Sequence, residues 1–177
     1  SQGLIAGINA AMSVLHRDPL ILDRSESYIG VLIDDLVTKD NREPYRMMTS
    51  RAEYRLLLRQ DNADLRLRGI GHEIGLVDDE TYAKLFQKEK DIQAEVERLE
   101  KTNVGANPKI QAFLERHEST ALKTGATLAE LVRRPELDYF MLTEIDEKRP
   151  ELSYDTAEQV NINIKYEGYL KRQQQQV

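Results

Sequence analysis

The chain has 177 residues, 40% of them hydrophobic and 32% charged, which excludes a disordered chain and fits a globular protein with its own core. The formal net charge of −6 excludes a nucleic-acid binder that is basic overall, so any such contact has to be local. The absence of cysteine excludes disulfides and thiolate catalysis, and no apolar run approaches the roughly 20 residues that span a bilayer.

Helical spacing of the apolar residues runs through most of the chain. It predicts helices, in chain order, over residues 2–16, 28–36, 51–59, 63–74, 79–101, 108–117, 128–133, 138–145 and from 155 to the C-terminus. Capping patterns mark several helix starts: Ser50 with Glu53, Asp78, Asn107 before Pro108, Thr127 with Glu130, and Asp155 with Glu158. Gly75 is placed to end the fourth of these helices.

The last predicted helix has a competing interpretation. Val160, Ile162, Ile164 and Tyr166 alternate with polar residues, as they would in a strand. The capping pattern and the charged continuation favour a helix, which is our prediction. The fold class is therefore predominantly all-α, an irregular multi-helix domain with room for a short strand pair near 37–48. We expect two helical subdomains, over 1–104 and 105–177.

The stretch 42–68 contains seven arginines, and no lysine occurs between Lys39 and Lys84. Arginine offers a planar fork of donors that fits phosphates and carboxylates two bonds at a time, and it stacks on rings. Because Tyr45 and Tyr54 are interleaved with these arginines, the stretch indicates oriented recognition.

On the predicted helix 51–59, Arg51, Arg55 and Arg59 stand at i, i+4 and i+8 and form one ridge, with Arg46 just before it. This ridge predicts a surface that contacts phosphates. The alternative is a set of structural ion pairs with the acidic residues of the same stretch, which are Glu43, Glu53, Asp61 and Asp64. From the residues alone both remain open.

Other motifs point to structure. The glycines of Gly69–Gly75 follow a helix and have the spacing G-x-G-x-x-x-G, which differs from a dinucleotide fingerprint. The adjacent carboxylates Asp34 and Asp35 would diverge by about 100° on a helix, which indicates a structural or arginine-pairing role. The three histidines are scattered, so no metal site or catalytic constellation is predicted.

Three segments resemble the MnmG (GidA) family, the flavin-dependent tRNA wobble-uridine modification enzymes. They are Tyr28–Leu36, Glu43–Leu67 and the segment from Gln159 to Tyr169, and the opening Gln2–Ala10 also fits. Met48 departs from the aromatic residue expected there. The resemblance implies a cytoplasmic parent enzyme that uses FAD and NADH. Together with the GTPase MnmE, and as a homodimer, it would add the 5-carboxymethylaminomethyl group to uridine 34 of tRNA.

The resemblance also implies that this chain lacks parts of the parent enzyme. The N-terminal FAD-binding domain and the extreme C-terminus of the parent are missing, so we expect no bound cofactor, no catalytic residue and no activity of the chain alone. Arg46 and Arg55 match positions thought to engage tRNA, and Arg51 and Arg59 extend that set on geometric grounds. The alternative function is a scaffold that docks MnmE or a second copy, with the arginines as internal ion pairs.

Overall fold

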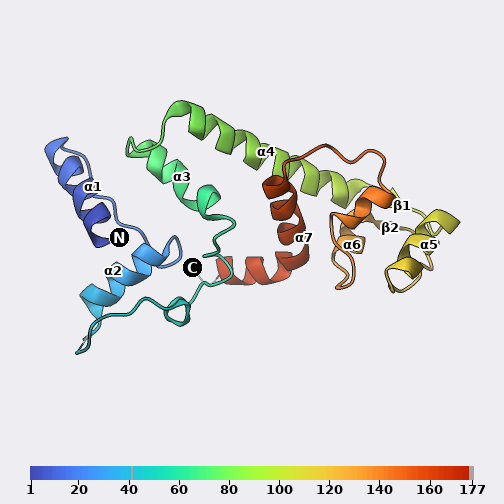
Figure 1. Cartoon of the computed structure of the whole chain (residues 1–177), viewed down its shortest axis with the longest axis horizontal. Helices are drawn as coiled ribbons and strands as arrows, with labels where there is room; N and C mark the ends of the chain where they lie inside the picture. Colours follow the sequence, from blue (N-terminus) through green and yellow to red (C-terminus); the bar gives the residue numbers. More distant parts are fainter. Residues whose placement is uncertain (41, 176–177) are drawn as a thin grey trace. The chain divides into compact units, whose positions relative to one another are not determined.

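The computed structural model describes residues 1–40 and 42–175, and these are mainly helical (Figure 1). Their elements are α1 (Gln2–Val14), α2 (Tyr28–Thr38), the 3₁₀ helix η1 (Thr49–Arg51), α3 (Ala63–Glu73), α4 (Asp79–Lys101), β1 (Asn103–Val104), α5 (Pro108–Arg116), β2 (Ala126–Thr127), α6 (Leu128–Val132), the 3₁₀ helix η2 (Met141–Glu144) and α7 (Tyr154–Gln174). The predominantly all-α prediction is confirmed.

The chain divides into two compact units. Unit 1 comprises residues 1–82 with the described part of 172–177, and unit 2 comprises residues 83–171. The two helical subdomains predicted over 1–104 and 105–177 stay a prediction.

Unit 1 has a small apolar core around α2. Val31 on α2 packs with Ala52 and Leu58 of the arginine-rich stretch, and Tyr28 covers them. The start of α2 is fixed by Ser27, whose Oγ accepts a hydrogen bond of 2.9 Å from the Gly30 amide. A Cβ on Gly30 would lie 2.3 Å from the Asp23 carbonyl oxygen, so the glycine lets the preceding loop run directly against the helix.

Unit 2 has a larger core, built where α5 and α6 meet the loops around them. Its buried members are Ile110, Phe113, Leu114, Leu131 and Leu137. The caps predicted for these two helices are confirmed: Asn107 accepts from the Ile110 amide at 3.0 Å, and Thr127 and Glu130 form a reciprocal capping box. These caps fix the entries of α5 and α6 and so aim their apolar faces at one core.

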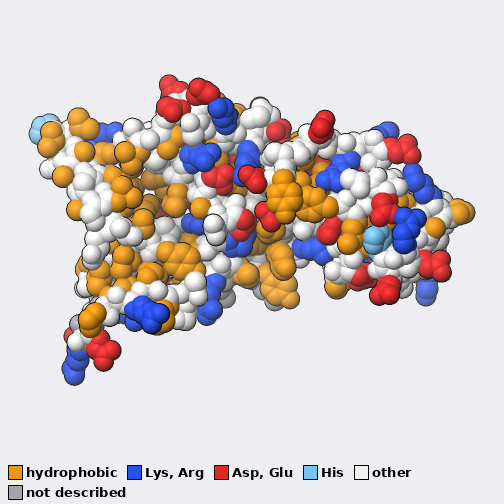
Figure 2. All heavy atoms as spheres, viewed as in Figure 1, with side chains coloured by type: hydrophobic (Ala, Val, Ile, Leu, Met, Phe, Trp, Pro, Cys, Tyr) orange, Lys and Arg blue, Asp and Glu red, His pale blue; other side chains and the backbone are white. Residues whose placement is uncertain are grey.

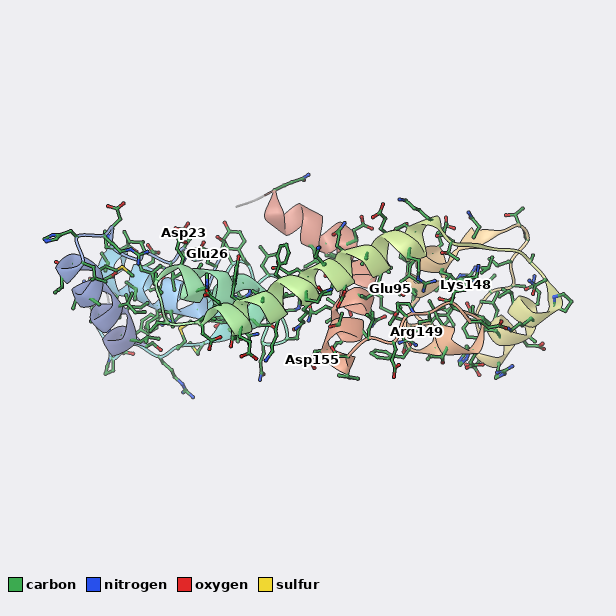
Figure 3. The ribbon with its side chains drawn as sticks, turned by 90° about the horizontal axis from the view of Figure 1, so that it is seen from above. Asp23, Glu26, Glu95, Lys148, Arg149 and Asp155 are labelled. Carbon is green, nitrogen blue, oxygen red and sulfur yellow. The ribbon has the colours of Figure 1, made fainter. Side chains whose placement is uncertain are left out.

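A largely buried polar cluster surrounds Glu95, which Figure 3 labels on α4. We call Glu95, Arg98, Tyr139 and Asp146 the Glu95 cluster. The Tyr139 hydroxyl donates to Glu95 at 2.8 Å, and Arg98 bridges Glu95 at 2.7 Å to Asp146 at 2.6 Å. The Arg149 guanidinium lies 4.0 Å from the centre of the Tyr139 ring. Burial, supported by the neighbouring Glu95, raises the pKa of Tyr139 to about 12, so the hydroxyl stays a donor.

Two predicted details are corrected and one is confirmed. The strand pair expected near 37–48 is not formed there by the described residues, because α2 continues to Thr38; Asn41 lies outside them. The pair is instead antiparallel β1–β2, with Asn103 opposite Thr127. The segment 138–145 forms only η2, and the 63–74 helix ends before Gly75 at φ +86° as expected.

The ambiguous last segment is helical, as α7. Its start is not capped by Asp155, which lies inside the helix. Ser153 accepts from the Thr156 amide at 3.3 Å instead, and its hydroxyl also bonds to the Thr156 hydroxyl at 2.8 Å. The alternation of Val160 and Ile164 with polar residues is also compatible with a helix, because these two side chains are four residues apart and both are buried.

Candidate nucleic-acid interface

The arginine-rich stretch is mostly irregular. Between α2 and α3 its described residues form only η1 and a succession of turns that lead to Asn62. The helix predicted over 51–59 is therefore wrong, and the ridge of Arg51, Arg55 and Arg59 that depended on it does not exist.

Arg24 explains why the predicted helix is lost. A capping box would need the Glu53 carboxylate at the Ser50 amide, but Glu53 accepts from Arg24 Nη2 at 2.8 Å and Nε at 3.1 Å. A helix would also need the Arg51 carbonyl for the amide four residues on, but that carbonyl accepts from Arg24 Nη2 at 3.1 Å. Arg24 thus occupies both the Glu53 carboxylate and the Arg51 carbonyl, which the predicted helix would need for its own hydrogen bonds.

Asp35 is the buried centre of the same region. Its carboxylate is fully buried and accepts from Arg24 at 2.6 Å, from Lys39 at 2.6 Å and from the Tyr45 hydroxyl at 2.7 Å. Burial alone would raise the pKa of Asp35, but hydrogen bonds from Lys39, Tyr45 and Arg24 outweigh it and hold that pKa well below its usual range. Asp35 is therefore ionised at neutral pH.

The residues around Asp35 form what we call the Arg24 cluster, made of Arg24, Asp34, Asp35, Lys39, Tyr45, Arg51 and Glu53. The hydrogen bond from Arg24 lowers the pKa of Glu53, and burial together with Asp35 raises the pKa of Tyr45. The arginine-pairing role predicted for Asp34 and Asp35 is confirmed.

Two of the four predicted site arginines are held by internal contacts. The Arg51 guanidinium lies 4.5 Å from the Tyr45 ring centre and 3.8 Å from Asp35, and its Nε donates to the Arg46 carbonyl at 3.1 Å. Arg59 is paired with Asp61 at 3.1 Å. Both side chains are half-buried, so their donors are largely committed within the fold.

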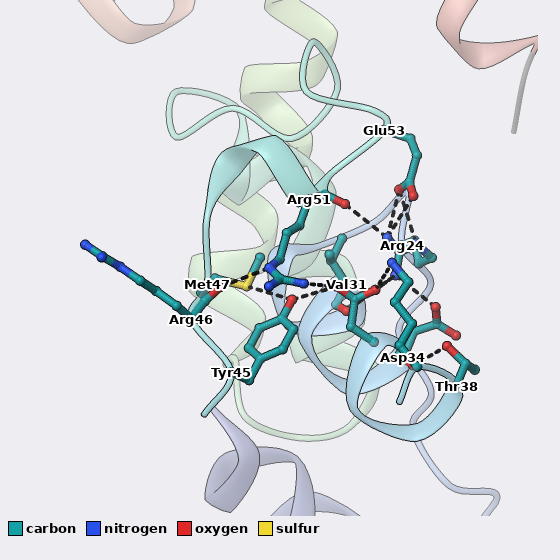
Figure 4. Close-up of polar contacts among 11 residues, drawn as sticks. Arg24, Val31, Asp34, Thr38, Tyr45, Arg46, Met47, Arg51 and Glu53 are labelled. Carbon is teal, nitrogen blue, oxygen red and sulfur yellow. Dashed lines mark hydrogen bonds and ion pairs between the residues drawn. The ribbon is translucent and has the colours of Figure 1, made fainter. Parts of the chain in front are cut away.

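The other two, Arg46 and Arg55, are exposed, and neither has a carboxylate partner among the described residues. Figure 4 shows the Arg46 side chain pointing away from the Arg24 cluster, although its backbone carbonyl is held by Arg51. Their guanidiniums therefore have donors available for an anion from outside.

The remaining arginines of the stretch differ again. Arg42 is highly exposed beside Asp40, at 3.2 Å. Arg66 is half-buried and bonds to Asn62 and to the Glu26 and Arg59 carbonyls, and burial lowers its pKa. The seven arginines thus do not form one surface. Arg24, outside the stretch, was missed by sequence reasoning, and the Asp34–Asp35 pair was the one signal that pointed to it.

The glycine-rich segment does not form a phosphate cradle. Gly69 and Gly71 lie inside α3, and a Cβ on Gly71 would meet the Val77 side chain at 2.9 Å. The space beside this glycine is filled by packing. Among the described residues, no group of three histidine or acidic side chains is placed to hold a metal ion. None of the helices that these residues form is long and apolar enough to cross a membrane.

Comparisons with known proteins point to one family. A family described as "tRNA modifying enzyme MnmG/GidA C-terminal helical domain" matches residues 79–174. Proteins named tRNA uridine 5-carboxymethylaminomethyl modification enzyme MnmG, from Lachnoclostridium phytofermentans and Caldicellulosiruptor saccharolyticus, are 59% and 58% identical over 100% of this chain. The solved structure of Aquifex aeolicus GidA in its form II crystal is similar, with a TM-score of 0.83, 37% identity and 99% of this chain covered.

These relatives are much longer than the chain. It spans 28% of the length of the two curated relatives and 27% of the solved Aquifex aeolicus chain.

Proposed function

The chain belongs to the MnmG/GidA family of tRNA-modifying enzymes, and we propose that it positions tRNA for wobble-uridine modification, with Arg46 and Arg55 gripping backbone phosphates. The observation that carries this proposal is the exposure of these two guanidiniums without an internal carboxylate partner among the described residues. Because the chain has a net charge of −6, a polyanion would be attracted only locally, and exposed arginines without a carboxylate partner provide such a local positive charge.

Arg51 and Arg59 have a different part in this proposal. The prediction from the sequence gave all four arginines the same role. Because Arg51 and Arg59 are committed to Asp35, Tyr45 and Asp61, we now assign them to shaping the loop that presents the other two.

Phosphate contacts fix the register and orientation of a nucleic acid, and sequence is read elsewhere. A uridine in an anticodon loop has to be splayed out before its base can be modified. The role proposed for Arg46 and Arg55 is therefore to hold the anticodon arm while the base reaches the chemistry.

That chemistry is assigned to the rest of the longer enzyme. FAD supplies redox chemistry there, with NADH as reductant, and the GTPase MnmE and a second copy of the enzyme are the proposed partners in the cytoplasm. The glycine-rich segment of this chain offers no cradle for a dinucleotide phosphate, since Val77 fills the space beside Gly71. The residues of this chain hold tRNA and carry no step of the reaction.

The test is a titration of unmodified tRNA against Arg46→Ala and Arg55→Ala, in this chain and in a full-length enzyme that contains it. Affinity is measured at salt concentrations from about 50 to 200 mM. Each lost phosphate contact should weaken binding and reduce the salt slope by about one. Arg116→Ala removes an exposed arginine paired with Glu144 in unit 2 and serves as the matched control. Unchanged affinity and slope in both variants would refute the proposal.

The second candidate is a protein-docking scaffold. It is favoured by large apolar side chains that are exposed, namely Leu4, Val14, Leu15, Ile21 and Val37. Figure 2 shows hydrophobic side chains on the surface over α1. If the arginine variants retain tRNA binding while Leu4→Ser and Val14→Ser weaken association with MnmE or with a second copy, this scaffold is the better description.

A further inference from the structure

Arg24 lies outside the arginine-rich stretch, yet its guanidinium ties that stretch to α2. On the α2 side, Nη1 donates to Asp34 at 2.9 Å and to Asp35 at 2.6 Å. On the other side, Nη2 donates to the Arg51 carbonyl at 3.1 Å and, with Nε, to Glu53. One planar fork thus clamps two segments that are far apart in the sequence (Figure 4).

The clamp continues to the backbone of Arg46. Asp35, held by Arg24, accepts from the Tyr45 hydroxyl at 2.7 Å and faces Arg51 at 3.8 Å. Arg51 in turn stacks on Tyr45 and donates from Nε to the Arg46 carbonyl at 3.1 Å. The Arg46 carbonyl and the side chain of the preceding residue, Tyr45, are therefore both held, while the Arg46 side chain is exposed.

The geometry of this clamp requires arginine. Its contacts approach from at least two directions in one plane, and the side chain is only 20% exposed. Lysine has the same charge but a single ammonium with three donors, so it cannot span Asp35 and Glu53 together. Arg24→Lys therefore breaks the clamp without changing the net charge of the chain.

We propose that Arg24 is a positioning residue for tRNA recognition, which acts by fixing the backbone that presents Arg46 to the anticodon-arm phosphates. This inference rests on the proposed function and adds to it a residue that would not touch the RNA. Arg24 would contribute to the binding free energy mainly by pre-organisation, because a loop that is fixed before binding loses less conformational entropy when it binds.

The experiment is a double-mutant cycle with unmodified tRNA, on this chain and on the full-length enzyme. Arg24→Lys should weaken binding about tenfold, the scale of one charge-assisted hydrogen bond, and should lower the salt slope. In the Arg46→Ala background, Arg24→Lys should have no further effect, because the contact it positions is already gone. Arg17→Lys, whose arginine donates to the Glu73 carbonyl in the same unit, is the control.

A second variant guards against loss of folding. Glu53→Ala removes a half-exposed partner of Arg24 and makes the chain more positive. Simple electrostatics would then strengthen tRNA binding, whereas loss of the clamp should weaken it. Glu43→Ala makes the same charge change at an exposed residue of the same stretch and should leave binding unchanged or tighter.

The outcomes separate the two ideas. If Arg46→Ala and Arg55→Ala do not affect binding, the proposed function fails. If they do, but Arg24→Lys is silent or weakens binding equally in both backgrounds, tRNA positioning stands and the role of Arg24 is wrong. Tighter binding by Glu53→Ala would also overturn the role of Arg24.

Discussion

Each unit of the chain contains an arginine that bridges carboxylates, three for Arg24 in unit 1 and two for Arg98 in unit 2, but the surroundings differ. In the Glu95 cluster, Arg98 joins Glu95 to Asp146 beside a large apolar core, and the tyrosine that donates to Glu95 is fully buried. In the Arg24 cluster, Arg24 joins α2 to an irregular stretch over a core of Val31, Ala52 and Leu58. Glu53 and Lys39 there are half-exposed.

The difference shows what ion pairs contribute in each setting. Unit 2 has capped helices and apolar packing, so its cluster adds to a structure that is already specified. In unit 1, the stretch that follows α2 has little regular secondary structure, so side-chain contacts hold it in place where backbone hydrogen bonds would hold a helix. A loop whose conformation is fixed by charged side chains can direct a neighbouring arginine into solvent at almost any angle. A continuous helix would restrict that angle to its own side-chain directions.

The largest effect is expected in unit 2. Glu95→Ala should lower the free energy of unfolding by about 3 kcal/mol, because it leaves the buried Tyr139 hydroxyl without its acceptor and removes one of the two carboxylates of Arg98. Urea denaturation followed by circular dichroism measures this. Glu97→Ala, at an exposed glutamate paired with Lys101, should leave the unfolding midpoint unchanged. A similar midpoint for both variants would mean that the Glu95 cluster contributes nothing special.

The corresponding change in unit 1 should be smaller and should depend on pH. Asp35→Asn should cost about 2 kcal/mol at neutral pH, less than in unit 2 because Lys39 is half-exposed and can be solvated. The folded pKa of Asp35 is depressed, so its ionised form stabilises the fold above the unfolded pKa of about 3.9. That stability is lost as the pH falls below about 4 towards the depressed value.

The measurement compares unfolding of the parent chain and Asp35→Asn from pH 7 to pH 2. The stability difference between them should be constant above about pH 5 and should shrink below about pH 4. Asp40→Asn, at an exposed carboxylate beside Arg42, should show no such dependence. A difference between parent and Asp35→Asn that stays constant down to pH 2 would show that the Arg24 cluster does not hold Asp35 ionised.

How far the sequence predicts a helix start depends on whether the groups of its cap are taken by distant residues. Helix starts in unit 2 were predicted where the cap is local, as at Asn107 and Thr127, since donor and acceptor lie within three residues. The Ser50–Glu53 pattern has the same spacing but failed, because Arg24, 29 residues away, takes the Glu53 carboxylate. The arginine stretch was correctly identified as unusual, but which arginines are exposed depends on long-range pairing that no local pattern encodes.

The smallest effect tests how closely the loop before α2, which contains Arg24, must pack against that helix. Gly30→Ala should destabilise the chain by about 1 kcal/mol, because the clash of its Cβ with the Asp23 carbonyl exceeds the gain in helix propensity. The same substitution at Gly7, an exposed helical glycine with nothing within 4 Å of its Cβ, should stabilise the chain by about 0.5–1 kcal/mol. Opposite signs of the two changes in thermal unfolding are therefore expected. If Gly30→Ala were stabilising as well, the loop before α2 could move away at no cost, and Arg24 would not be held where its clamp requires.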